Sequence, residues 1–168
     1  KVYWLRVFEI PQASRASRGR PVVNILPLAQ DERISTILPV KEFDDNRFVF
    51  MATAQGTVKK TRLSAFSRPR STGLIALDIV EGDRLIGAAL TEGEDDVMLV
   101  TSAGKAIRFH EGDVREMGRT ARGVRGVKLD GNAAVISLII PQEGGMVLTA
   151  SANGYGKKTA ASEFPLRG

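Results

Sequence analysis

The chain has 168 residues, 43% of them hydrophobic, which is enough to build a core and excludes a mainly disordered state. It has no cysteine and a single histidine, which excludes disulfides, thiolate metal sites and a histidine-based metal cluster or triad, and favours a reducing compartment. The formal net charge of +5 is moderate, so the placement of the basic residues is more informative than their number. No apolar run approaches membrane-spanning length and no signal peptide opens the chain, so we expect no membrane partner.

Residues 1–46 predict an incomplete copy of a unit that recurs later in the chain. A predicted strand over Val2–Ile10 is followed by a loop rich in Arg and Ser, Gln12–Gly19. Two further strands are predicted over Val22–Leu28 and Ile34–Val40, with a polar turn containing Asp31 between them. Compared with the later units, this first unit lacks its opening strand.

The second unit, residues 47–94, begins with a hairpin. The opening strand Val49–Thr53 is apolar and β-prone, and Gln55-Gly56 supplies the turn because glycine adopts positive φ without strain. In the return strand Thr57–Leu63, Val58 and Leu63 are apolar and Lys59, Lys60 and Arg62 are charged, and we expect this strand to carry its positive charge outward.

The rest of the second unit is a loop followed by two apolar strands. The loop Ser67–Gly73 again combines Arg, Ser and Gly, and strands are predicted over Leu74–Val80 and Leu85–Leu90. An acidic turn, Glu81-Gly82-Asp83, separates the two strands.

The same order of elements recurs in a third unit, residues 95–144, and in a partial fourth, residues 145–168. Hairpins are predicted over Val97–Phe109 and Met146–Thr159, and the turn glycines Gly56, Gly104 and Gly154 lie 48 and 50 residues apart. In the third unit the Arg loop is Arg115–Gly123, and it precedes strands over Val124–Leu129 and Val135–Ile140.

Short apolar, β-branched runs between Gly or Asp turns predict an all-β protein, and no stretch has sustained helical periodicity. Four-stranded units of about fifty residues fit the blades of a propeller-like fold, here a partial set within one domain. A Greek-key sandwich with accidental similarity is the alternative, but three matching turns and three matching Arg loops favour the propeller.

Basic residues recur at two places in the unit, the return strand and the Arg loop, which predicts a positive band along one rim. We take the following as candidate DNA-binding residues: Arg15, Arg18, Arg20, Lys59, Lys60, Arg62, Arg68, Arg70, Lys105, Arg108, Arg119, Arg122, Arg125, Lys157 and Lys158. A duplex carries a phosphate about every 1.7 Å of its axis, so it would meet several blades in succession. For a single Lys or Arg, simple solvation of an outer strand is the better explanation, and the repeated offsets favour binding for the set.

The composition of the Arg loops favours phosphate contacts over base recognition. Arg, Ser, Thr and Gly supply side-chain and backbone donors, whereas no recognition helix, zinc finger or aromatic stacking platform is predicted. Any sequence preference would come from the bendability of the DNA. The second hypothesis is a protein-interaction scaffold whose basic rim binds an acidic protein. Acidic residues lie elsewhere, at Glu92–Asp96 and at the turns containing Asp31, Asp83 and Asp130, so we expect them apart from the basic rim.

Three further features of the sequence resemble functional sites, but we do not expect them to have those functions. Asn153–Thr159 resembles a phosphate-binding loop but lacks its Ser or Thr after the lysine and fills a hairpin position. His110 is expected to be an exposed strand-end residue, and Trp4 and Tyr3 to pack in the core or between blades. We expect no catalytic and no metal-ligating residue in this chain.

Four collinear runs resemble the C-terminal domain of the bacterial DNA gyrase A protein: Arg20–Ile34 (RPVVNILPLAQDERI), Phe50–Thr61 (FMATAQGTVKKT), Gly123–Leu129 (GVRGVKL) and Asn153–Thr159 (NGYGKKT). The resemblance covers essentially the whole chain. It implies a β-pinwheel, a relative of the propeller in which neighbouring blades exchange strands. The basic Gln-Arg-Gly-rich box of that family's first blade is absent, so we expect the chain to begin beyond it.

By resemblance, the domain wraps duplex DNA around its basic perimeter for the type IIA topoisomerase DNA gyrase, a bacterial cytoplasmic enzyme associated with the nucleoid. Its partners would be DNA, the rest of gyrase A, and gyrase B. No cofactor is implied for this chain itself, whereas the holoenzyme would use ATP and Mg to introduce negative supercoils. The family's catalytic tyrosine lies in another domain, so neither Tyr3 nor Tyr155 takes that role. The equivalent domain of topoisomerase IV is the alternative within the family.

Overall fold

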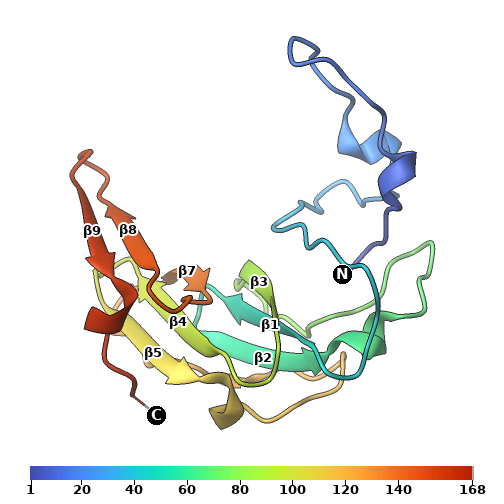
Figure 1. Cartoon of the computed structure of the whole chain (residues 1–168). Helices are drawn as coiled ribbons and strands as arrows, with labels where there is room; N and C mark the ends of the chain where they lie inside the picture. Colours follow the sequence, from blue (N-terminus) through green and yellow to red (C-terminus); the bar gives the residue numbers. More distant parts are fainter. Residues whose placement is uncertain (168) are drawn as a thin grey trace.

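The computed structural model describes residues 1–167, which form nine strands in three antiparallel sheets and five short 3-10 helices, with no α-helix among them (Figure 1). The strands are β1 (Phe48–Thr53), β2 (Thr57–Arg62), β3 (Leu85–Thr91), β4 (Asp96–Thr101), β5 (Ala106–His110), β6 (Val124–Arg125), β7 (Val135–Ile139), β8 (Met146–Ala150) and β9 (Gly156–Ala160). The 3-10 helices are η1 (Val7–Glu9), η2 (Val22–Asn24), η3 (Leu63–Phe66), η4 (Glu111–Asp113) and η5 (Ala161–Glu163). The prediction of an all-β protein is confirmed. Over residues 1–167, no helix has the length and hydropathy of a membrane span.

The three predicted hairpins are confirmed. β1 pairs with β2, β4 with β5 and β8 with β9, all antiparallel. Gly56, in the first turn, has a φ of +85°, and its two counterparts in the other turns also have positive φ. Local turn chemistry therefore sets the register of each hairpin.

Successive units are joined by an exchanged strand. The first sheet has the order β3-β1-β2-β6, in which β6 comes from the third unit and pairs with the return strand of the second. Val58 lies opposite Val124, and the isolated bridge between Val2 and Leu74 repeats this pairing one unit earlier. The pairing of β6 is short because it ends at the hairpin turn, where the amide of Gly126 donates to the Gly56 carbonyl at 2.9 Å.

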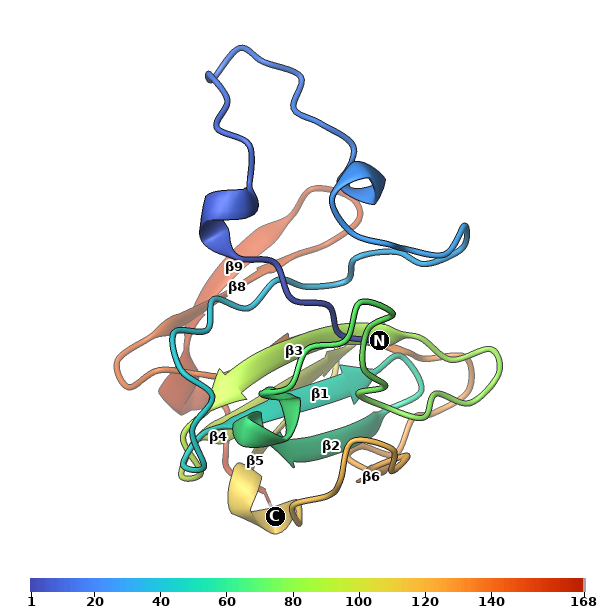
Figure 2. The same ribbon diagram turned by 90° about the vertical axis from the view of Figure 1, so that its right-hand side faces the viewer.

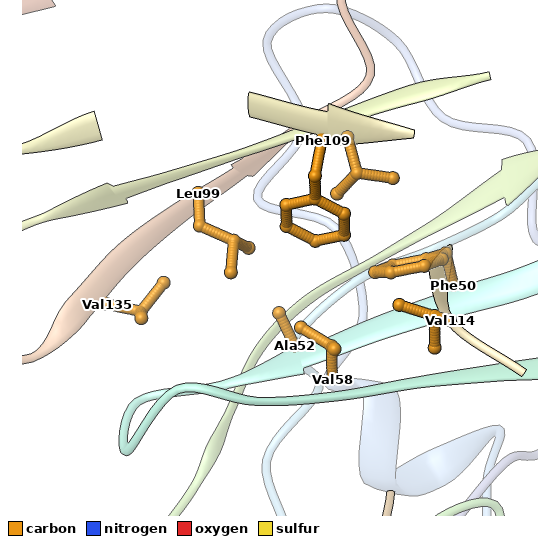
Figure 3. Packing of buried hydrophobic residues seen from close by; sticks show 8 residues of the cluster. Phe50, Ala52, Val58, Leu99, Phe109, Val114 and Val135 are labelled. Atoms are coloured by element: carbon orange, nitrogen blue, oxygen red, sulfur yellow. The ribbon is translucent and has the colours of Figure 1, made fainter. Parts of the chain in front are cut away.

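The opening strand β1 is buried on both faces, which explains its uninterrupted apolar sequence. Phe50 and Ala52 belong to a cluster shared with the next sheet, in which Phe50 lies 6.3 Å from Phe109, centroid to centroid (Figure 3). Val49 and Met51, on the opposite face, belong to a second cluster that faces the first unit. Both faces of the strand thus hold neighbouring units together.

The strands predicted for the first unit are wrong. Val2 forms only an isolated bridge, Val22–Asn24 is a 3-10 turn, and residues 34–40 form no strand. In Figures 1 and 2 the segment between Val7 and Leu28 projects away from the sheets. The physical reason is that a strand needs a hydrogen-bonded neighbour, which the opening strand supplies in the later units. The first unit has no opening strand within residues 1–46.

The third strand of the later units is also shorter than predicted. Residues 74–80 contribute only a bridge at Leu74, because their expected neighbour, the return strand of the first unit, is itself not formed. Of the predicted strand Val124–Leu129, only β6 pairs. The fourth strands, β3 and β7, are formed as predicted to within a residue.

A buried hydroxyl on β2 provides a test of these sheets. Thr61 is 0% exposed, and within residues 1–167 its Oγ1 has no hydrogen-bond partner. An unsatisfied buried polar group is costly, so Thr61→Val is expected to raise the free energy of unfolding by about 1 kcal/mol in urea denaturation. Thr91 is the matched control, because its equally buried hydroxyl donates to Glu111 at 2.8 Å. Thr91→Val should therefore destabilise the chain, and the same sign for both variants would contradict this account.

Candidate nucleic-acid interface

The return strands β2, β5 and β9 lie on the outer, convex side of the curved array of sheets, and β3 and β7 lie on the inner side (Figure 1). Contacts between β3 and β7 close the inner side, where Gly87 lies against the Leu138 side chain. Each return strand is followed in sequence by an Arg loop. The predicted basic positions therefore belong to the outer part of each unit.

The Arg loops of the second and third units lie across the return-strand residues of the unit before them, since a Cβ at Gly73 would lie 3.2 Å from the Val2 carbonyl oxygen. In the third unit, Met117 of this loop donates its amide to the Lys60 carbonyl at 2.9 Å. The loop ends at Gly123, whose φ is +99°, and a Cβ there would lie 2.4 Å from the Val58 carbonyl oxygen. Arg167 repeats the first contact one unit later, donating to the Arg108 carbonyl at 2.7 Å. The Arg loops of the later units therefore occupy equivalent positions at the outer junctions, whereas the loop Gln12–Gly19 lies in the segment that projects away from the sheets (Figure 2).

Lys59, which we expected to point outward, is buried, and that expectation is wrong. Its side chain is 0% exposed, and Nζ donates to the carbonyls of Ala76 at 2.7 Å, Arg119 at 2.5 Å and Ala121 at 2.9 Å. Burial, and after it the charge of nearby Arg119, lower the pKa of Lys59 to about 8. The ammonium joins β2 to the Arg loop of the third unit and to Ala76 of the second unit, and it does not face solvent.

Lys60 is also buried, which corrects the same expectation. Its Nζ donates to the Glu111 carbonyl at 2.9 Å and lies 3.8 Å from the Glu111 carboxylate. Arg108 occupies the same position one unit later and donates to the Ala161 carbonyl at 2.9 Å, while it also pairs with Asp96 at 2.6 Å. The basic side chain at this position therefore donates a hydrogen bond to the carbonyl of the first residue of the next 3-10 helix.

Glu111 was not among the predicted residues. Its carboxylate is buried and accepts from Thr91 Oγ1 at 2.8 Å and from the amides of Gly93 at 2.7 Å and Asp95 at 3.0 Å. A signal that could have found it is the recurrence of a basic residue at the positions of Lys60 and Arg108, because that side chain contacts the first residue of the next 3-10 helix.

Three further predicted residues are neutralised by carboxylates. Arg62 forms a two-pronged pair with Glu116 at 2.9 and 2.5 Å, and this hydrogen bond raises the pKa of Arg62 and lowers that of Glu116. The other two pairs are Lys105 with Asp130 at 2.7 Å and Arg122 with Asp78 at 2.8 Å. The expectation that acidic residues lie apart from the basic rim is therefore wrong for Asp130 and for Asp96, which pairs with Arg108.

The remaining candidates are exposed and, within residues 1–167, form no ion pair; Arg119, which is half-buried, likewise has no carboxylate partner. The exposed set, which we call the free basic set, comprises Arg15, Arg18, Arg20, Arg68, Arg70, Arg125, Lys157 and Lys158. All of its members lie in or next to an Arg loop or on a return strand.

The structure also places the three features to which the sequence analysis gave no chemical function: residues 153–159, His110 and Trp4. Residues 153–159 form the β8–β9 turn and β9, followed by a three-residue 3-10 helix. His110 is half-buried at the end of β5, and its Nδ1 accepts from the Gly112 amide at 3.0 Å. Trp4 packs against Phe43 of its own unit, with 6.0 Å between their ring centroids, and against the cluster of the second unit that contains Val49 and Met51, as expected for a residue between units.

Sheets joined by exchanged strands, with arginine loops at their outer junctions, define a propeller-like all-β domain. The model of the DNA gyrase C-terminal domain family, described as a beta-propeller, matches residues 1–41, 47–92, 95–142 and 145–168. The chain belongs to this family, which confirms the resemblance found in the sequence.

The relatives agree with this assignment. DNA gyrase A of Salmonella typhimurium is 58% identical over 167 residues, which cover 99% of this chain and 19% of that protein. A crystal structure of the C-terminal domain of DNA topoisomerase IV has a TM-score of 0.85 and 29% identity, covering 96% of this chain and 50% of that one. A structure of the DNA gyrase A C-terminal domain has a TM-score of 0.77 and 25% identity, covering 88% and 49%. These relatives confirm the β-pinwheel class, and the high identity to gyrase A favours gyrase over the topoisomerase IV alternative.

The role of Lys59 can be separated from that of an exposed arginine. Lys59→Met removes the ammonium from three carbonyls, so we expect the free energy of unfolding to fall by about 1–3 kcal/mol. Arg68→Ala is the control and should change it by less than about 0.5 kcal/mol. Urea denaturation followed by circular dichroism measures both. Equal stability of the two variants would contradict a structural role for Lys59.

The lowered pKa of Lys59 also predicts a pH dependence of stability. The folded chain releases this proton near pH 8, whereas the unfolded chain holds it to about pH 10.4. The unfolded state thus binds more protons in this window, and the contribution of Lys59 to stability rises with pH. The free energy of unfolding of the wild type, measured relative to Lys59→Met, should therefore increase from about pH 8 to about pH 10.4. A flat or falling difference would show that the pKa is not lowered.

Proposed function

We propose that this chain binds duplex DNA along its outer junctions and bends it, as part of the C-terminal domain of a gyrase A protein. The observation that carries the proposal is the repeated placement of the Arg loops of the later units across successive return strands, with arginines that have no carboxylate partner in residues 1–167. Equivalent positions on successive units give cations along a curved outer edge. A duplex that follows this edge must curve with it.

The chemistry of the loops suits the sugar-phosphate backbone. Guanidinium groups pair with phosphate oxygens in a two-pronged geometry, and the loops add Ser and Thr hydroxyls near them. Contacts of this kind hold a duplex without reading its bases, so we expect little sequence specificity beyond bendability.

Membership of the DNA gyrase C-terminal domain family supports this proposal. We propose the functions of the whole enzyme on the same basis. The chain would act with the rest of gyrase A and with gyrase B in the bacterial cytoplasm, at the nucleoid. ATP and Mg would be used elsewhere in that enzyme to drive negative supercoiling. This chain would contribute the curvature of the bound DNA.

The salt dependence of duplex binding tests the proposal. Each phosphate neutralised contributes about 0.9 to the slope of log affinity against log salt, so the eight residues of the free basic set limit the slope to about −7. Arg68→Ala/Arg70→Ala should weaken binding equally on unrelated duplexes and reduce the slope by about 2. The charge-matched control is Arg33→Ala/Lys41→Ala, at exposed residues outside the Arg loops, which should have less effect.

Two outcomes would reject parts of this proposal. Absence of duplex binding at low salt would remove the DNA function and leave the protein-interaction scaffold as the better hypothesis. Bending is measured by energy transfer between the ends of a short duplex. An unchanged end-to-end distance at saturating protein would leave binding without curvature.

A further inference from the structure

Lys59 on β2 is a buried cation that no carboxylate neutralises. Its side chain is 0% exposed, its Nζ is held by three carbonyl oxygens, and within residues 1–167 it forms no ion pair. The neighbouring Lys60, by contrast, lies 3.8 Å from the Glu111 carboxylate. Burial of an unneutralised charge is costly, which points to a role for this ammonium beyond support of the sheet.

The repeat shows that the position of Lys59 does not need a charge. Val2 forms the exchanged-strand pair of the first unit, as Val58 forms that of the second. The residue after it is therefore Tyr3 in the first unit, and the hairpin register places Ile107 there in the third. The Tyr3 ring lies against the glycine that ends the Arg loop of the second unit. A return strand and the Arg loop across it can thus be built around an uncharged side chain.

The ammonium of Lys59 supports a turn of the Arg loop in the third unit. It donates to the carbonyls of Arg119 and Ala121, which stand on either side of the exposed Thr120. The Ala121 amide closes the turn by donating to the Gly118 carbonyl at 3.1 Å. Lys59 therefore holds the inner side of this turn, and Thr120 lies on its solvent side.

Positive charge is in excess around this turn. Arg119 lies close enough to Lys59 to add to the effect of burial, and together they lower the Lys59 pKa to about 8. Arg122 follows the turn, and its Nε donates to the Asp78 carboxylate at 2.8 Å. Asp78 is also the carboxylate that acts on Lys59, in the opposite direction and less strongly. Within residues 1–167, three cations and one carboxylate thus leave two positive charges here, and a charge inside the protein is screened by salt less than an exposed one.

We propose that Lys59 is a positioning residue for duplex binding: it holds the turn Gly118–Arg122 and adds its charge to a phosphate site on the solvent side of that turn. This role rests on the proposed function, since it assumes that the outer edge binds DNA. Arg119 and Thr120 would contact the phosphate, and Lys59 would act through them without touching it. A phosphate nearby favours the charged form of the ammonium, so duplex binding and the proton on Lys59 stabilise each other.

The affinity for a labelled duplex, measured by fluorescence anisotropy against pH at constant low salt, is the direct test. As the pH rises through about 8, Lys59 of the free chain loses its proton and the phosphate site loses a charge. We expect the bound duplex to hold this proton about tenfold more tightly, which makes the affinity fall about fivefold from about pH 7 to about pH 9.

Lys59→Met removes this titration. At about pH 7 it should bind the duplex about tenfold more weakly than the wild type, and its affinity should change little up to about pH 9. Any pH dependence that remains in this variant belongs to other groups and is subtracted. The matched control is Lys41→Met, at an exposed lysine outside the Arg loops, which should keep the pH dependence of the wild type.

A second pair of variants leaves the buried lysine in place. Thr120→Glu puts a carboxylate on the solvent side of the turn, where it replaces the phosphate, so binding should weaken at least about tenfold and lose its pH dependence. Ser71→Glu puts the same charge in the Arg loop of the second unit, which lies across Tyr3 and not across a lysine. It should weaken binding and keep the pH dependence of about fivefold.

The outcomes separate the role of Lys59 from DNA binding itself. Wild-type affinity that stays constant with pH, or equal pH dependence in the wild type and Lys59→Met, would reject the role of Lys59 and leave DNA binding intact. Loss of the pH dependence in Ser71→Glu would place the titrating group elsewhere and reject it as well. Circular dichroism checks folding, and the two glutamate variants decide the question where Lys59→Met is unfolded. Absence of duplex binding at every pH would reject the proposed function and this role with it.

Discussion

The outer edge of the return strand β2 is completed by the unit that follows it, and the rest of the structure depends on this exchange. The backbone groups of a strand edge must be paired, and here β6 and the Arg loop of the third unit pair with β2. The exchange fixes where the Arg loops lie, since a loop that leads into the exchanged strand has to cross the junction. The basic outer edge is a consequence of how the sheets are joined.

Close approach at the junction also explains the glycines that end these loops. At Gly123 a side chain would collide with the Val58 carbonyl, and at Gly73 it would lie 2.9 Å from the Tyr3 ring. Both residues have positive φ, so steric space and backbone conformation impose the same requirement. These glycines therefore recur along the sequence at the same interval as the junctions between units.

Burial of two lysines at one junction shows how the fold uses cations internally. Carbonyl oxygens at turns and loop ends have no partner in a sheet, and Lys59 satisfies three of them with one ammonium group. Lys60 satisfies another beside the buried carboxylate of Glu111, which itself holds the turn that leads into β4. Arg108 does the same in the next unit, with its charge balanced by Asp96. A positively charged residue on a return strand is therefore as much a part of the junction as a candidate for DNA.

The sequence by itself determined the repeat, the three hairpins and the apolar opening strands, because turn glycines and short apolar runs act over a few neighbouring residues. Tyr3, Trp4 and the Asn153–Thr159 segment were also assigned non-chemical roles from sequence, and the structure places Trp4 against Phe43 and the segment in a hairpin. Only the tertiary structure decided which cations face outward, since Lys59 and Arg68 look alike in sequence and differ in whether the next unit covers them. It also decided that residues 22–28 and 34–40 form no strands, because a strand exists only where a neighbour accepts its hydrogen bonds.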